Sequence, residues 1–161
     1  MSYTIPDEPR PSPWNHLVVR PNAPLLASML CGAWLAWPWF VVNAIAMGSP
    51  TKRKEIALCV AAFVGTAALA QLVITLARAG VIPPGPGEQI ALLAVTTFKL
   101  TITYYISVLQ ERTFHVYEYY GGSVRAAGGV LTAGYWLRGL VIGMSDDPLW
   151  VIIVAGGIGG P

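Results

Sequence analysis

The sequence predicts an all-α integral membrane protein, a compact up-and-down bundle of four transmembrane helices with a broken, glycine-rich C-terminal segment. Two observations lead to this fold class. Of the 161 residues, 55% are hydrophobic and only 11% are charged, whereas a soluble domain usually carries about 25% charged residues. The apolar residues are also concentrated in runs of about 20, the length that crosses the hydrocarbon core as a helix. The composition excludes an ordinary soluble enzyme, a disordered chain and a disulfide-stapled secreted module.

Residues 1–24 hold six of the thirteen prolines. Because proline removes a backbone donor and obstructs the preceding turn, this region is predicted to be an extended tail, and residues 25–161 are predicted to form a single transmembrane domain. The first span is predicted over 25–47, with a kink at Pro38. Three tryptophans surround the kink far from an interfacial belt, which predicts packing against a helix or a cavity wall: Trp34, Trp37 and Trp39.

The second span is predicted over 56–77. It carries a small residue at every fourth position, which favours close helix approach: Ala57, Ala61 and Gly65. The third span is predicted over 89–110, and nothing breaks its helical pattern before Gly121. A helix over 89–120 would be about 48 Å long against a core of about 30 Å. It would therefore project a polar, tyrosine-rich end beyond the bilayer.

The C-terminal region, residues 121–161, holds eleven of the seventeen glycines. A fourth span is predicted either over 126–144 or as one broken span over 130–158. The apolar stretch 149–160 is too short to cross alone, so it forms part of that broken span or a re-entrant piece. Gly139 and Gly143 have the GxxxG spacing of a helix contact.

The basic residues predict the orientation, because cytoplasmic loops are enriched in lysine and arginine. Lys52, Arg53, Lys54, Arg112 and Arg125 lie in the first and third loops, against Arg10, Arg20 and Arg78 on the opposite side. This distribution predicts that loops 48–55 and 111–125 are cytoplasmic and that both termini lie outside. The expected location is a bacterial inner (plasma) membrane.

Lys99 is the most informative residue, because it lies near the centre of the third span, where a lysine costs about 2.5–3.5 kcal/mol. It belongs to a polar stripe on one helix face: Thr96, Lys99, Thr103, Ser107 and Gln110. The predicted spans contain no Asp or Glu, so Lys99 has three candidate partners. These are an anionic ligand or lipid headgroup, an acidic residue of a partner subunit, or threonine hydroxyls, helix carbonyls and water.

Gln71 and Thr75 of the second span are predicted to face Lys99 and complete an intramembrane polar site. Arg138 weakens the fourth span. It is interpreted as an interfacial anchor, with an acid pair to Asp146 or Asp147 as the alternative.

Glu111, His115 and Glu118 follow one another at i, i+4 and i+7, a spacing that resembles a metal-ligand array on a helix. Without an HExxH motif the stronger interpretation is a solvated helix face, so no metal and no cofactor are predicted. Cys31 and Cys59 do not form a CxxC pair and are interpreted as buried hydrophobes. No catalytic motif is present.

These features predict a small non-enzymatic membrane protein that acts through another protein. It would be an accessory subunit of a membrane complex, or an inhibitor or immunity-type protein. The alternative is a subunit of an anion transporter or channel with Lys99 lining the path. The expected partners are membrane lipid and either a protein partner or a second copy. A net charge of +2 gives no basic face for nucleic acid.

Overall fold

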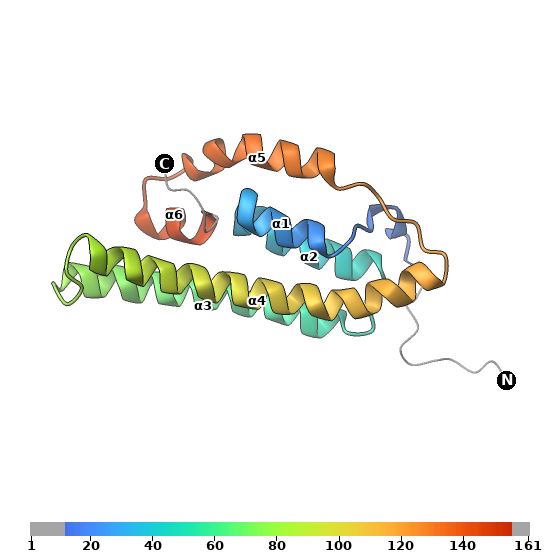
Figure 1. The fold of residues 1–161 in the computed structure, drawn as a ribbon, viewed down its shortest axis with the longest axis horizontal. Coiled ribbons are helices and arrows are strands. Elements are labelled where there is room, and N and C mark those ends of the chain that lie inside the picture. The colour runs from blue at the N-terminus through green and yellow to red at the C-terminus, as the bar shows by residue number, and fades with distance from the viewer. Residues whose placement is uncertain (1–11, 156–161) are drawn as a thin grey trace.

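The computed structural model describes residues 12–155, so residues 1–11 of the predicted tail and residues 156–161 lie outside it. The described chain consists of helices joined by short loops (Figure 1). In chain order they are a 3-10 turn η1 (Asn15–Leu17), α1 (Asn22–Leu30), α2 (Ala33–Ala46), α3 (Lys52–Arg78), α4 (Pro86–Tyr119), α5 (Gly128–Ile142) and α6 (Pro148–Val154).

The two long helices, α3 and α4, form an antiparallel pair along one side of the molecule (Figure 1). Pro86 begins α4, where a missing N–H costs no helical hydrogen bond. Both helices are long enough and apolar enough to cross a membrane, and only 22% and 28% of the residues in their most apolar stretches are buried within the chain. The predictions of helices over 56–77 and 89–120 are confirmed.

The register of this pair is set by Glu55 and Gln110, whose side chains are hydrogen-bonded across it. Thr66 lies eleven residues after Glu55, and Lys99 lies eleven residues before Gln110. Since eleven residues make about three helical turns, Thr66 and Lys99 lie at the same level on the facing sides. Lys99 is therefore about 16 Å from Gln110 along α4.

The prediction of one kinked helix over 25–47 is wrong, because the chain reverses after α1. Gly32 makes the turn with φ +111°, a conformation that glycine adopts without steric penalty. Leu25 of α1 packs on the same cluster as Trp37 and Phe40 of α2, so the two helices form an antiparallel hairpin. With 9 and 14 residues, its arms are about 14 and 21 Å long, shorter than the hydrocarbon core.

The C-terminal region also divides into two helices, α5 with 15 residues and α6 with 7. Asp147 caps α6 by accepting a hydrogen bond from the Leu149 N–H at 2.9 Å. The indole of Trp150 donates to the Val141 carbonyl of α5 at 3.0 Å, so α6 folds back beside α5. A bundle of four spanning helices is not confirmed, since within residues 12–155 only α3 and α4 have the length and apolarity to cross.

A layer between α3–α4 and α5 is assembled from the two short elements (Figure 1). The α1–α2 hairpin occupies one half and α6 the other, and they approach from opposite ends of the molecule. Their tips meet, because Ala33 and Trp34 of α2 line the same cavity as Ile153 and Val154 of α6. Two half-length elements therefore fill the place that one full-length helix would take.

The hairpin changes the relation between the N-terminal region and the first loop. The Val19 N–H donates to Asn43 Oδ1 near the C-terminal end of α2 at 3.0 Å, and the Tyr117 hydroxyl donates to the Asn15 carbonyl at 3.3 Å. Residues 12–20 and the loop 47–51 consequently lie at the same end of the molecule (Figure 1). The predicted placement on opposite membrane faces depended on a single crossing over 25–47, where the structure has a hairpin instead.

Candidate functional site: the polar seam of α4

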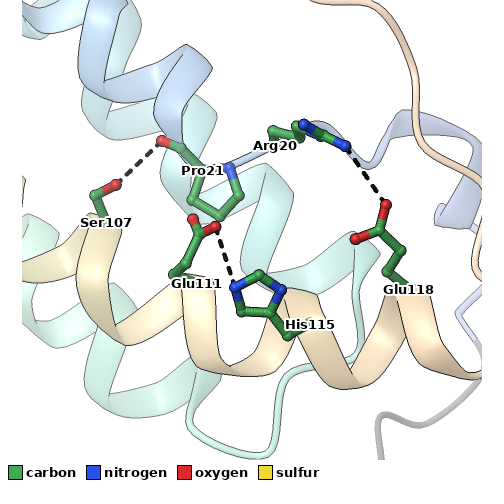
Figure 2. A network of polar contacts seen from close by, with 6 residues as sticks. All are labelled: Arg20, Pro21, Ser107, Glu111, His115 and Glu118. Atoms are coloured by element: carbon green, nitrogen blue, oxygen red, sulfur yellow. Dashed lines mark hydrogen bonds and ion pairs between the residues drawn. The ribbon is translucent and has the colours of Figure 1, made fainter.

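The polar stripe predicted on the third span points into the molecule. Lys99, Thr103, Ser107 and Gln110 are all buried, and Thr96, the first residue of the stripe, is half-buried. We call these four buried residues the polar seam. Their side chains reach every element of the middle layer. Ser107 Oγ, for example, donates to the Pro21 carbonyl before α1 at 3.3 Å (Figure 2).

Lys99 binds the C-terminal end of α6. Its ammonium donates to the Ile152 carbonyl at 2.9 Å and to the Ala155 carbonyl at 2.5 Å. The last carbonyls of a helix lack intrahelical partners and carry the negative end of the helix dipole. A cation at this position therefore satisfies the carbonyls, and they in turn satisfy the buried cation.

Thr103 links the seam to α2. Its hydroxyl donates to the Lys99 carbonyl one turn earlier at 2.7 Å and accepts a hydrogen bond from Trp37 Nε1 at 3.1 Å. The indole nitrogen of a buried tryptophan requires such a partner. This pair fixes the rotation of α2 against α4 close to the tip of the hairpin.

Gln110 joins three helices. Its Nε2 donates to the Phe40 carbonyl of α2 at 2.8 Å and to Glu55 Oε2 of α3 at 2.9 Å. Its Oε1 accepts a hydrogen bond from Asn43 Nδ2 at 3.0 Å. A buried polar group is costly unless it is hydrogen-bonded, and here both amides are engaged.

Glu55 is a buried carboxylate that the sequence analysis did not single out. It is 1% exposed, and its Oε1 accepts hydrogen bonds from the hydroxyls of Ser49 and Thr51, both at 2.6 Å. It lies in the first turn of α3, where the helix dipole favours a negative charge. The charged run Lys52-Arg53-Lys54 immediately before it made this region resemble a solvated loop. The signal that could have found it is the pair of amides, Asn43 and Gln110, in otherwise apolar segments.

The structure does not bring Gln71 and Thr75 to Lys99. Both are exposed on the outer side of α3, and Thr75 Oγ1 donates to the Gln71 carbonyl within the helix. Thr66 lies on the α4 side instead. It is fully buried, and its hydroxyl has no hydrogen-bond partner among residues 12–155. Arg138 is half-buried on α5, in a layer separate from the seam.

The predicted small-residue contacts are only partly used. A Cβ at Gly65 would lie 2.7 Å from the Phe98 ring, so α3 and α4 approach closely there, but Ala57 and Ala61 are exposed. Gly139 and Gly143 are exposed on α5. The close contact of α5 is made by Gly134, where a Cβ would lie 2.4 Å from Leu35 of α2.

Glu111, His115 and Glu118 share one face of the projecting end of α4 (Figure 2). His115 Nε2 lies 3.5 Å from Glu111 Oε1, whereas Glu118 turns to Arg20 at 3.6 Å. Within the described chain, no group of three or more His, Cys, Asp or Glu residues could hold a metal ion.

An apolar cavity of about 380 Å³ lies where α2, α3 and α6 meet. Three indoles contribute to its walls, and each donates its N–H elsewhere: Trp34 to the Cys31 carbonyl, Trp37 to Thr103 and Trp150 to Val141. The prediction of a cavity wall is thus confirmed for Trp34 and Trp37, while Trp39 packs against α1. Cys59 also lines the cavity. Both cysteines are buried, as predicted, and both are free. We call this the tryptophan cavity.

Comparisons of the chain with protein-family models, with curated proteins and with solved structures find no match. The function is accordingly argued from the structure, and from three of its features: the polar seam, the tryptophan cavity and the outer surface of α3 and α4.

Proposed function

We propose that the chain is a small, non-enzymatic integral membrane protein of a bacterial inner membrane. In this proposal it acts as an accessory or inhibitory subunit by binding a protein partner across the exposed face of α3. The length and apolarity of α3 and α4 support insertion into a bilayer. So do their exposed large side chains, such as Val64 at 58% and Ile90 at 68% exposure, because soluble proteins rarely expose extended apolar faces.

The observation that carries the partner proposal is the position of Gln71. Its amide is exposed on α3, six residues from the helix centre at Gly65. That offset is about 9 Å, inside the half-thickness of about 15 Å of the hydrocarbon core. A primary amide facing lipid there would lack hydrogen-bond partners, whereas a neighbouring helix would supply them.

The hairpin also sharpens the expected orientation. Arg20, Lys52, Arg53, Lys54, Arg112 and Arg125 all lie toward one end of the described molecule, with the Arg125 N–H bonded to the Val18 carbonyl. The opposite end carries Arg78. The buried Lys99 and the half-buried Arg138 are not counted, because the comparison is restricted to basic residues in the loops and at the helix ends. Over the same described residues the four-span arrangement gives five basic residues against two, so six against one is the stronger bias. The positive-inside rule then places residues 12–20 and 47–55 in the cytoplasm.

Lys99 favours the partner proposal over an anion route. Its ammonium is already bound by two carbonyl oxygens of α6, and carbonyl oxygens repel an anion. The tryptophan cavity is not lined by Lys99 and offers no indole N–H to a ligand, so nothing there would replace the hydration of an anion. The positive charge of Lys99 is better explained by its hydrogen bonds to α6, which hold that helix against α4.

Photo-cross-linking tests the partner proposal. The probe p-benzoylphenylalanine is placed at Leu72, next to Gln71, and as a control at Leu140, which is 70% exposed on α5 on the opposite side of the molecule. We expect a protein adduct in native membranes from position 72 and only lipid adducts from position 140. The adduct mass distinguishes a foreign partner from a second copy.

A second variant tests the amide itself. With the probe at Leu72, Gln71→Leu should lower the adduct yield about threefold, the equivalent of one interhelical hydrogen bond. The same substitution at Gln89, exposed near the start of α4, should leave the yield unchanged. Equal adducts from positions 72 and 140, or a yield insensitive to Gln71→Leu, would contradict the proposal.

A further inference from the structure

We propose that the tryptophan cavity holds one acyl chain of an anionic phospholipid, whose phosphate is bound at Lys52 and Arg53. The inference rests on the membrane placement proposed above but not on a protein partner. It assigns a lipid site to one side of α3, between α2 and α6.

The walls of the cavity select the chemistry of the occupant. Besides the three indoles, they consist of apolar side chains and Cys59, including Ala33, Val60 and Phe63. Because every lining indole donates its N–H within the chain, a polar ligand would lose its hydration without compensation. A volume of about 380 Å³ lies within the range of ligand sites, and an unbranched hydrocarbon chain meets both conditions.

The cavity opens sideways rather than toward the polar ends. Pro38, Val60 and Phe63 line it and are also exposed on the outer surface of α2 and α3. Phe63 lies two residues from the centre of α3, about 3 Å along the axis. In a bilayer the opening therefore faces acyl chains, which are present there at high concentration.

The charge of the headgroup is inferred from the residues on the side of α3 that runs from the cavity opening to the N-terminal end of the helix. Lys52, Ile56, Val60 and Phe63 recur at spacings of four, four and three, so they share one side of α3. Lys52 is about 12 Å from Val60 at helical rise, at the end of the helix where headgroups would lie. Its side chain and that of Arg53 are exposed, and basic clusters at this level attract anionic lipids.

Lys54 provides an internal comparison, since it projects to another side of the same helix turn. Its ammonium lies 6.0 Å from the centre of the Tyr105 ring of α4. It has the same charge and is also exposed, but it does not lie on the side that leads to the cavity. A lipid site of the proposed geometry therefore depends on Lys52 and not on Lys54.

Native mass spectrometry of the full-length protein tests the chain site. The protein is purified in mild detergent and equilibrated with phosphatidylglycerol or phosphatidylcholine. We expect one retained lipid in the unsubstituted protein. Val60→Trp should close the opening and lower lipid retention on the order of tenfold, because a few buried methylenes are worth that much affinity. Val64→Trp is the matched control, since Val64 is 58% exposed against 57% for Val60 and does not line the cavity.

The headgroup site is tested by removing one charge at a time. Lys52→Gln should lower the preference for phosphatidylglycerol over phosphatidylcholine about fivefold, whereas Lys54→Gln should leave it unchanged. Equal retention by Val60→Trp and Val64→Trp would overturn the chain site, and equal preference in Lys52→Gln and Lys54→Gln would overturn the phosphate site. If the protein resists carbonate extraction from membranes, either of these two results refutes the lipid site but leaves the proposed membrane placement standing. A protein released by carbonate refutes the membrane placement itself.

Discussion

Replacing Gln110 by leucine is expected to destabilise the protein by about 3 kcal/mol or more. The substitution keeps a side chain of similar bulk but leaves two buried groups without a partner, Asn43 Nδ2 and Glu55 Oε2, and removes one hydrogen bond from the Phe40 carbonyl. Each unsatisfied group costs about 1–3 kcal/mol, and a charged group costs more. The loss is expected to separate α2 from α3 and α4 at the end where the hairpin enters.

The measurement is the free energy of unfolding in mixed micelles of dodecyl sulfate and dodecyl maltoside, followed by circular dichroism. Gln89→Leu, the same change at an exposed position of the same helix, should alter the value by less than about 0.5 kcal/mol. A Gln110→Leu protein as stable as the Gln89→Leu protein would show that the Gln110 network does not hold the helices together.

Replacing Lys99 by methionine is expected to release α6. Methionine is unbranched and similar in length but donates no hydrogen bond, so the carbonyls of Ile152 and Ala155 lose their shared partner. Hydrogen bonds to a charged group are worth about 1.5–3 kcal/mol each, partly offset because the buried ammonium no longer has to be desolvated. A net loss of about 2 kcal/mol would make opening of α6 on the order of 30-fold more frequent.

Hydrogen exchange of the amides in residues 148–155 reports this opening directly. Lys99→Arg retains charged donors and should restore most of the protection, while Lys54→Met, the same change at an exposed site, should have no effect on α6. Unchanged exchange in Lys99→Met would mean that apolar packing of Ile153 and Val154 alone holds α6.

The long helices could be predicted from the sequence because their signals are local. Apolar length and the absence of a breaker define α3 and α4 to within a few residues of the predicted bounds. The seam could also be predicted, since residues spaced by three and four share a helix face wherever that helix packs. The groups that the seam residues contact could not be predicted from the sequence. The partners of Lys99, for example, lie more than 50 residues away in α6.

The α1–α2 hairpin was missed because hydropathy does not record the direction of the chain. Residues 25–47 are as apolar and as long as a single span, and the reversal depends on one residue, Gly32. Glu55 was missed because its neighbours are basic, although its own side chain is buried among hydroxyls and an amide. The chain reversal at Gly32 and the burial of Glu55 both depend on tertiary contacts, which local composition and hydropathy do not record.

The most direct test of the proposed membrane arrangement, with a hairpin that returns to its own side, is the sidedness of three single cysteines. Trp14→Cys, Pro50→Cys and Pro84→Cys, all at exposed positions, are made in a background with Cys31→Ala and Cys59→Ala. Intact cells are treated with a membrane-impermeant thiol reagent before and after permeabilisation. The arrangement predicts labelling of position 84 from outside and of positions 14 and 50 only after permeabilisation. If position 14 reacts together with position 84 and apart from position 50, residues 25–47 cross the membrane and the hairpin arrangement is contradicted.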